Sequence, residues 1–147
     1  MQKQKKMSVC FADMAGWRRL VDKFGARKAV AVLQTMMKKA GDIIVRHRGR
    51  IRKYIGDAIL FTFAKPRDAV LAATEIAATC KRSVGEIDLT YSVAVATGPV
   101  FVCRIGHPSF KTDDVMGATV NAAALLVREA MRSAGGVALC EETKRLV

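Results

Sequence analysis

SVCFADMAGW, residues 8–17, contains the change from strand to helix around which the rest of the chain is arranged. Its first five residues are apolar or small, and they predict a buried strand that ends at Asp13. The next four, Met14-Ala15-Gly16-Trp17, predict a tight turn into a helix. Because a helix start presents free backbone N–H groups, this turn is a candidate site for binding phosphate.

The pattern of apolar residues predicts the remaining elements. Helical spacing runs through residues 29–44, from Pro66 to Cys80, and from about 118 to 131. Strands are expected at residues 50–55, 58–63, 89–95, 100–104 and 137–140, with turns at Gly56-Asp57 and around Gly98-Pro99. The order β-α-α-β-β-α-β-β-α-β indicates an α+β fold, in which helices pack on a central and largely antiparallel sheet.

Length and composition favour one globular domain. The 147 residues suffice for a single hydrophobic core, so we interpret residues 1–147 as one domain with a basic N-terminal extension over about residues 1–6. No apolar run approaches the roughly 20 residues that span a bilayer, which predicts no transmembrane segment and a cytoplasmic location. The four cysteines form no C-x-x-C pair, and His47 and His107 have no partner at metal-ligand spacing, so no zinc site is expected.

The chain is strongly basic, with 25 lysines and arginines against 13 aspartates and glutamates and a formal net charge of +12. Such a charge predicts attraction to polyanions, which include nucleic acid, an anionic membrane and a nucleoside triphosphate. The densest basic run, residues 46–53, is more typical of a solvated face than of a binding site. Charge alone does not choose among these partners.

Two aspartates stand where neighbouring strands would bring them together. Asp13 ends the first strand, and Asp57 lies at the tip of the predicted hairpin. If these strands are neighbours in the sheet, both carboxylates reach the same edge. Mg²⁺ is usually held by one or two carboxylates together with substrate phosphates. The pattern therefore indicates a magnesium or manganese site that binds a phosphate substrate.

Three ordered blocks of sequence carry a resemblance to a known family. The segments Phe11-Ala12-Asp13-Met14-Ala15-Gly16-Trp17, Lys53-Tyr54-Ile55-Gly56-Asp57-Ala58 and Gly117-Ala118-Thr119-Val120-Asn121 resemble the signature blocks of class III adenylyl and guanylyl cyclases. The similarity extends from about Met7 to the end of the chain. It implies a ferredoxin-like βαββαβ core that forms a head-to-tail homodimer. One protomer then supplies the metal-binding aspartates, and the other supplies base recognition and transition-state residues.

The resemblance also implies roles for individual residues. Asp13 and Asp57 would bind two Mg²⁺ or Mn²⁺ ions, Lys53 and Asp114 would recognise the base, and Asn121 would position the ribose. Adenine presents a donor at N6 and an acceptor at N1, which match a carboxylate and an ammonium group. Guanine would meet the same pair with donors and acceptors mismatched. The Lys53–Asp114 combination therefore favours ATP and an adenylyl cyclase.

The match to the family fails at one catalytic position. An arginine normally lies four residues after the asparagine and reaches the triphosphate in the transition state, but Leu125 stands there. Arg128, a helical turn beyond Leu125, is a candidate replacement that we include among the catalytic residues with Asn121. Many members of the family also continue past a segment like residues 141–147 with a further pair of strands.

Two alternatives to an active adenylyl cyclase remain open at this point. Leu125 favours a weakly active or inactive cyclase homology domain that binds nucleotide and acts as a regulatory dimerisation module. The basic charge allows a nucleic-acid-binding module of ferredoxin-like topology. That module would need ordered aromatic residues on two central strands, which Phe11, Phe61 and Phe63 do not provide, so no nucleic-acid partner is expected. The sequence names no regulatory domain or partner.

Overall fold

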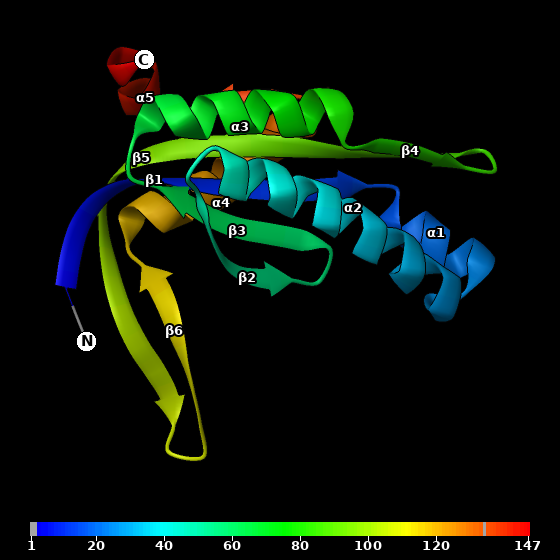
Figure 1. The fold of residues 1–147 in the computed structure, drawn as a ribbon, viewed down its shortest axis with the longest axis horizontal. Coiled ribbons are helices and arrows are strands. Elements are labelled where there is room, and N and C mark those ends of the chain that lie inside the picture. Colours follow the sequence, from blue (N-terminus) through cyan, green and yellow to red (C-terminus); the bar gives the residue numbers. More distant parts are fainter. Residues whose placement is uncertain (1–2, 134) are drawn as a thin grey trace.

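The computed structural model describes residues 3–133 and 135–147, which form a mixed sheet covered by helices (Figure 1). The path through the sheet is β2-β3-β1-β5-β4, and both β6 and β7 pair with β5. The elements are β1 (Lys3–Ala15), α1 (Trp17–Phe24), α2 (Ala26–Arg46), β2 (Arg50–Ile55), β3 (Ala58–Phe63), α3 (Pro66–Thr79), β4 (Lys81–Val84), β5 (Ile87–His107), β6 (Phe110–Met116), α4 (Ala118–Ala130), β7 (Val137–Leu139) and α5 (Glu141–Leu146).

The α+β fold predicted from the sequence is confirmed. The strand pairs are antiparallel, apart from the parallel pair of β5 with β7. Apart from the short strand β4 between α3 and β5, the order β1-α-β2-β3-α3-β5 is that of a ferredoxin-like core, with the helices α1 and α2 both falling between β1 and β2. Among the described residues, no helix is long and apolar enough to cross a membrane.

Alternation along β1 divides the interior into two hydrophobic clusters. Cys10 and Ala12 face the larger cluster, which α2 and α3 cover, while Val9 and Phe11 face a smaller one beneath α4. Successive side chains of a strand point to opposite faces of its sheet, so one short apolar run serves both clusters. Asp13 continues the second set, and its side chain therefore leaves the sheet on the α4 side.

The first strand is longer than the apolar pattern predicts. Residues 3–6, interpreted from the sequence as a basic extension, belong to β1, where Lys3 pairs with Val102 and Lys6 with Pro99. The pattern missed them because their side chains are exposed. Backbone pairing with β5, rather than burial, orders this part of the strand. The interpretation of residues 1–147 as a single domain stays a prediction.

The turn predicted at Gly98-Pro99 is wrong, because β5 runs without interruption from Ile87 to His107. Both residues pair with β1 and lie under the start of α4. A Cβ atom at Gly98 would stand 2.6 Å from the Thr119 hydroxyl oxygen, so glycine is needed for close approach of the helix. The same Thr119 hydroxyl donates a hydrogen bond of 2.8 Å to the carbonyl oxygen of Pro99. Here a Gly-Pro pair marks helix packing and not a change of direction.

Candidate active site

Asp13 and Asp57 meet at one edge of the sheet. Asp13 lies near the end of β1, and Asp57 lies in the β2–β3 hairpin, where Gly56 has a φ of 60°. Because β3 pairs directly with β1, the hairpin brings Asp57 alongside Asp13. Both carboxylates are half-buried. They open into a cavity of about 280 Å³ that is lined by Phe11, Asp13, Ile55, Asp57, Ala58, Ala124, Val127 and Arg128.

Burial and a neighbouring carboxylate both disfavour the ionised form of Asp57 in this cavity. Burial raises the pKa of the Asp57 carboxyl above its ordinary value, and the neighbouring Asp13 raises it further. Hydrogen bonds from the backbone amides of Asp57 and Met14 act in the opposite direction. A carboxyl with a raised pKa favours its protonated form, so a cation bound between the two aspartates would relieve the repulsion.

The donor set fits a hard divalent cation. Within residues 3–133 and 135–147, the structure contains no cluster of three or more histidine, cysteine, aspartate or glutamate side chains that could hold a metal. Two carboxylates alone suit Mg²⁺ or Mn²⁺, which keep water and substrate oxygens as their other ligands. They do not suit structural zinc, which takes four protein ligands.

The strand-to-helix turn follows Asp13 directly and depends on a glycine. Gly16 adopts a φ of 94°, and a Cβ atom there would lie 2.9 Å from Leu89 and 3.0 Å from the Asp88 carbonyl oxygen. Helix α1 begins at the next residue, Trp17. The Met14 amide already donates to Asp13 Oδ1 at 2.9 Å, so it orients the carboxylate. Met14 and Ala15 belong to β1, and Gly16 precedes the first residue of the helix, so a phosphate-binding role for this turn stays a prediction.

Lys53 and Asp114, the predicted base-recognising residues, contact each other directly. The distance from Lys53 Nζ to Asp114 Oδ2 is 3.0 Å. Asp114 is almost buried, with 8% of its side chain exposed, while Lys53 is 42% exposed. The second carboxylate oxygen, Asp114 Oδ1, accepts a hydrogen bond of 2.8 Å from the Val115 amide. One donor and one acceptor are therefore held side by side on β2 and β6.

A bulge in β2 places Lys53 for this contact. The pairing of β2 with β3 shifts register between Ile51 and Lys53, so that Lys53 pairs with Leu60. Leu60 packs into the cluster beneath α4, and Lys53 leaves the sheet on that same side. A bulge adds one residue to its strand and redirects the side chains that follow. Without it, alternation would point Lys53 toward α2.

Helix α4 carries the three remaining predicted positions. Asn121 is exposed in its first turn, where its backbone N–H donates to the Gly117 carbonyl oxygen at 3.1 Å. Leu125 is also exposed, at 63%. Arg128 lines the aspartate cavity of its own chain together with Asp13 and Asp57. The Lys53–Asp114 pair does not line that cavity, so the predicted site residues fall into two separate groups within one chain.

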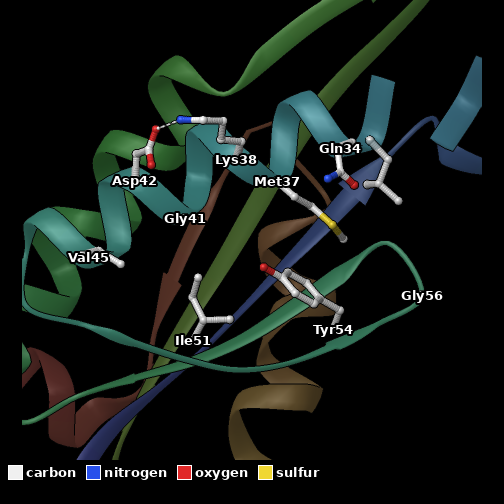
Figure 2. A pocket seen from close by; sticks show the side chains of 10 residues that line it. Gln34, Met37, Lys38, Gly41, Asp42, Val45, Ile51, Tyr54 and Gly56 are labelled. Atoms are coloured by element: carbon white, nitrogen blue, oxygen red, sulfur yellow. Dashed lines mark hydrogen bonds and ion pairs between the residues drawn. The ribbon is translucent and has the colours of Figure 1, made fainter. Parts of the chain in front are cut away.

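A larger cavity lies elsewhere, between α2 and β2, and has a volume of about 490 Å³. Figure 2 shows Tyr54 and Met37 pointing toward one another across it, with Ile51 beside them. Its charged members, Lys38 and Asp42, form an exposed ion pair of 2.9 Å at its rim. An apolar cavity without paired carboxylates offers little to a phosphate substrate, so size does not identify the candidate site here.

The sequence did not indicate the apolar wall of the aspartate cavity. Ala124, Val127 and Arg128 lie at helical spacing on one side of α4, and Ile55 and Ala58 flank Asp57 in the hairpin. The spacing on α4 was the available signal, but small apolar residues at such positions usually indicate core packing. The ion pair of Lys53 with Asp114 was also missed, because strand β6 was not among the expected strands.

Comparison with known proteins agrees with this geometry. Residues 1–147 match the family described as the adenylate and guanylate cyclase catalytic domain. The chain therefore belongs to this family of nucleotide cyclase domains. The resemblance carried by the three sequence blocks is thus confirmed.

Relatives known from sequence add the context of longer proteins. An uncharacterised protein of Mycobacterium tuberculosis is 32% identical over 126 residues, which are 81% of this chain and 23% of that protein. A second uncharacterised protein of M. tuberculosis is 31% identical over 131 residues, again 23% of its length. The chain thus spans less than a quarter of the length of these curated relatives.

Solved structures show the same fold. The adenylyl cyclase CyaB from P. aeruginosa superimposes with a TM-score of 0.84 and 21% identity, over 99% of this chain and 82% of that one. The guanylate cyclase domain of RhGC from Catenaria anguillulae, solved in complex with GTP, gives a TM-score of 0.83 and 21% identity over 98% of this chain and 83% of that one. Both kinds of cyclase share the fold, so the fold does not select the base.

Proposed function

We propose that this domain is an adenylyl cyclase that converts ATP to 3′,5′-cyclic AMP and pyrophosphate, with each site completed by two copies of the chain. The observation that carries the proposal is the separation of the predicted site residues into two groups. Asp13 and Asp57 share one cavity, while Lys53 and Asp114 pair with each other outside it. A head-to-tail homodimer would place one group opposite the other.

The aspartate group handles the phosphates in this proposal. Asp13 and Asp57 would hold two Mg²⁺ or Mn²⁺ ions, which when bound activate the attacking oxygen and neutralise charge on the leaving group. The half-burial of both carboxylates and the raised pKa of Asp57 support a site built to receive cations. The helix start at Gly16 and Trp17 contributes free backbone N–H groups toward a phosphate.

The reaction is an intramolecular displacement at phosphorus. The ribose 3′-oxygen forms a bond to the α-phosphorus and loses its proton, the bond from that phosphorus to the bridging oxygen breaks, and pyrophosphate leaves. Most of the rate enhancement in such transfers comes from positioning and electrostatics. We assign the ribose to Asn121, and we assign Arg128 to the triphosphate because it lines the aspartate cavity.

The choice of ATP rests on the Lys53–Asp114 pair. The pair presents an ammonium donor beside a carboxylate acceptor, and adenine N1 and N6 require that pair of partners. The near-complete burial of Asp114 makes the choice energetically meaningful, because a mismatched buried polar group costs about 1–3 kcal/mol. On binding adenine, each partner would replace their mutual contact with one hydrogen bond to the base.

A second candidate function is favoured by Leu125. With an exposed leucine where the family has an arginine, the domain would bind ATP but turn it over slowly, and would then act by dimerisation. The retention of both aspartates and of the Lys53–Asp114 pair favours an active adenylyl cyclase over this regulatory dimerisation module.

Mixing two impaired variants is expected to restore activity, which tests the shared site. An Asp13→Ala chain lacks the phosphate half and a Lys53→Ala chain lacks the base half, so their heterodimer contains one intact site. Random exchange of subunits should restore about one quarter of wild-type activity, since half of the dimers are mixed and each has one good site of two. The measurement is cyclic AMP formation against mixing ratio.

The same experiment assigns Arg128 to a half of the site. Because Arg128 lines the cavity of its own Asp13 and Asp57, Arg128→Ala should be rescued by Lys53→Ala and not by Asp13→Ala. Arg132→Ala, a change of equal charge at an exposed position, is the control and should keep full activity alone. Rescue of Arg128→Ala by Asp13→Ala would place Arg128 in the other half and contradict the assignment.

Removing the lysine of the base pair should weaken the preference for ATP. We expect Lys53→Met to lower kcat/KM for ATP about 10- to 100-fold, since one buried hydrogen bond is lost and Asp114 loses its cation. The value for GTP should fall much less, so the ratio of the two is the quantity to measure. Lys38→Met, at an exposed surface pair, is the matched control. An unchanged ratio would remove Lys53 from base recognition.

A further inference from the structure

A second cavity differs from the aspartate cavity in its lining, which contains five lysines and arginines and no acidic residue. Strand β3 ends at Phe63, whereas β1 continues past it to Lys3 and β2 begins at Arg50. The space left where β3 stops is a cavity of about 230 Å³. We call it the cationic notch, and its lining residues are Lys5, Lys6, Met7, Arg48, Arg50, Arg52, Thr62, Phe63 and Ala64.

Two of the five cations in the notch are neutralised by the protein. Lys6 forms an ion pair of 3.3 Å with Glu142, and Arg48 forms one of 3.0 Å with Asp68. Within residues 3–133 and 135–147, the other three cations, Lys5, Arg50 and Arg52, take part in no ion pair. The notch therefore carries three positive charges that the protein leaves without a direct partner.

The uncompensated cations act on one another. The pKa of Lys5 is lowered, first by the adjoining Lys3 and then also by Arg52 and Arg50. The pKa of Arg52 is lowered by burial and then by Arg50, while Asp113 on β6 opposes this effect. Each of these cations disfavours the charged form of its neighbour, and an anion bound among them would reduce that repulsion.

Arg52 is already oriented for such a ligand. It is half-buried, and its Nε donates a hydrogen bond of 2.9 Å to the Thr62 hydroxyl oxygen. This contact fixes the plane of the guanidinium and leaves its two terminal nitrogens for an acceptor. A planar pair of N–H donors matches two oxygens of one phosphate group.

We propose that the cationic notch binds a small phosphate-bearing anion of the diphosphate class. Three free cations match the charge of a diphosphate better than the single charge of a carboxylate. The volume of about 230 Å³ corresponds to several water molecules at about 30 Å³ each, which is room for a diphosphate but not for a folded partner. The notch shares no lining residue with the aspartate cavity, so this proposal does not rest on the proposed function.

Calorimetric titration of the whole chain with pyrophosphate tests the site. Chelator and low salt are used, so that no metal bridges the ligand to Asp13 and Asp57. We expect saturable binding that becomes about tenfold weaker or more in Arg52→Gln and in Arg50→Gln, since each removes a charge-assisted contact. Arg18→Gln, on the exposed face of α1, is the matched control and should bind as the wild type does.

Thermal unfolding supplies a second measurement. It distinguishes cations that bind an anion from cations that only stabilise the fold. Without ligand, Arg50→Gln and Lys5→Gln should melt at a higher temperature than the wild type, because repulsion is relieved. With pyrophosphate, the wild type should gain stability and both variants should gain less. Parallel titrations with inorganic phosphate and with ADP distinguish a free anion from the diphosphate of a nucleotide.

Two results would overturn the proposal. One is binding of pyrophosphate that Arg50→Gln and Arg52→Gln leave unchanged, which would place the anion elsewhere. The other is absence of saturable binding by the wild type. A lower melting temperature of the ligand-free variants would then mean that the cations stabilise the fold by themselves. Loss of cyclase activity in Asp57→Ala bears on neither result.

Discussion

Asp57→Ala is expected to lower the rate of cyclic AMP formation by at least about 10³-fold, the largest loss that any single change should cause. The substitution removes one of two carboxylates that would hold the metal ions, and metal stabilisation of the transition state is worth several kcal/mol. The measurement is kcat at saturating ATP with Mn²⁺ or Mg²⁺. Asp42→Ala, which breaks only an exposed ion pair, is the matched control and should retain activity.

The stability of Asp57→Ala distinguishes a loss of catalysis from a loss of folding, and its dependence on pH can be predicted. Because the folded protein raises the pKa of Asp57, the ionised carboxyl costs free energy, and this cost appears as pH rises from the ordinary pKa of 3.8 through the raised value. At neutral pH, metal-free Asp57→Ala should therefore be no less stable than the wild type. An Asp57→Ala protein that is folded and fully active would exclude Asp57 from catalysis.

Leu125→Arg should increase turnover, by as much as about 10²- to 10³-fold, which is the largest gain that we expect. Leu125 is 63% exposed and lies one helical turn after Asn121, so an arginine fits there without disturbing the core. A cation that contacts the developing charge in phosphoryl transfer can be worth about 10³ in rate. The measurement is kcat and KM for ATP in parallel with the wild type.

A gain of activity needs a control for added charge. Val30→Arg adds the same charge at another exposed apolar position, on α2, and should leave kcat unchanged. If Leu125→Arg leaves both kcat and ATP affinity unchanged, the argument from the missing arginine is wrong. If Leu125→Arg raises kcat in chains that keep Arg128 but not in chains that carry Arg128→Ala, the two guanidinium groups act on the same charge from the two chains.

The sequence predicted those parts of the molecule that depend on local patterns. The apolar run before Asp13, the Gly56-Asp57 hairpin and the stripe along α2 are set by alternation, turn chemistry and helical spacing, and all three elements are present. Val30 lies within the apolar pattern of residues 29–44 but is 51% exposed. The stripe is narrower than the pattern suggested, because α2 covers the sheet with one side only.

The misses came from contacts between distant segments. Gly98-Pro99 has the composition of a turn, but its need for glycine comes from Thr119, twenty-one residues away. Strand β6 has few apolar residues to signal it, since its pairing with β5 is mostly exposed. The contact of Lys53 with Asp114 depends on both that strand and the β2 bulge. No pattern within either segment encodes such a contact.

The candidate site was predictable to the extent that its residues lie in short blocks. Asp13, Asp57, Lys53, Asp114 and Asn121 were all named from the sequence, and their catalytic roles remain proposals. The sequence did not indicate that Arg128 lies with the aspartates of its own chain. That placement follows from how α4 crosses β1, which depends on the fold as a whole.

The most direct test of the account is formation of cyclic nucleotide by the purified chain, with ATP and GTP compared at equal concentration and with Mn²⁺ or Mg²⁺. We predict cyclic AMP from ATP, little cyclic GMP from GTP, and no product from Asp57→Ala. ATP binding without any product would contradict an active enzyme and favour the regulatory dimerisation module. Cyclic GMP as the main product would contradict the base assignment made from Lys53 and Asp114.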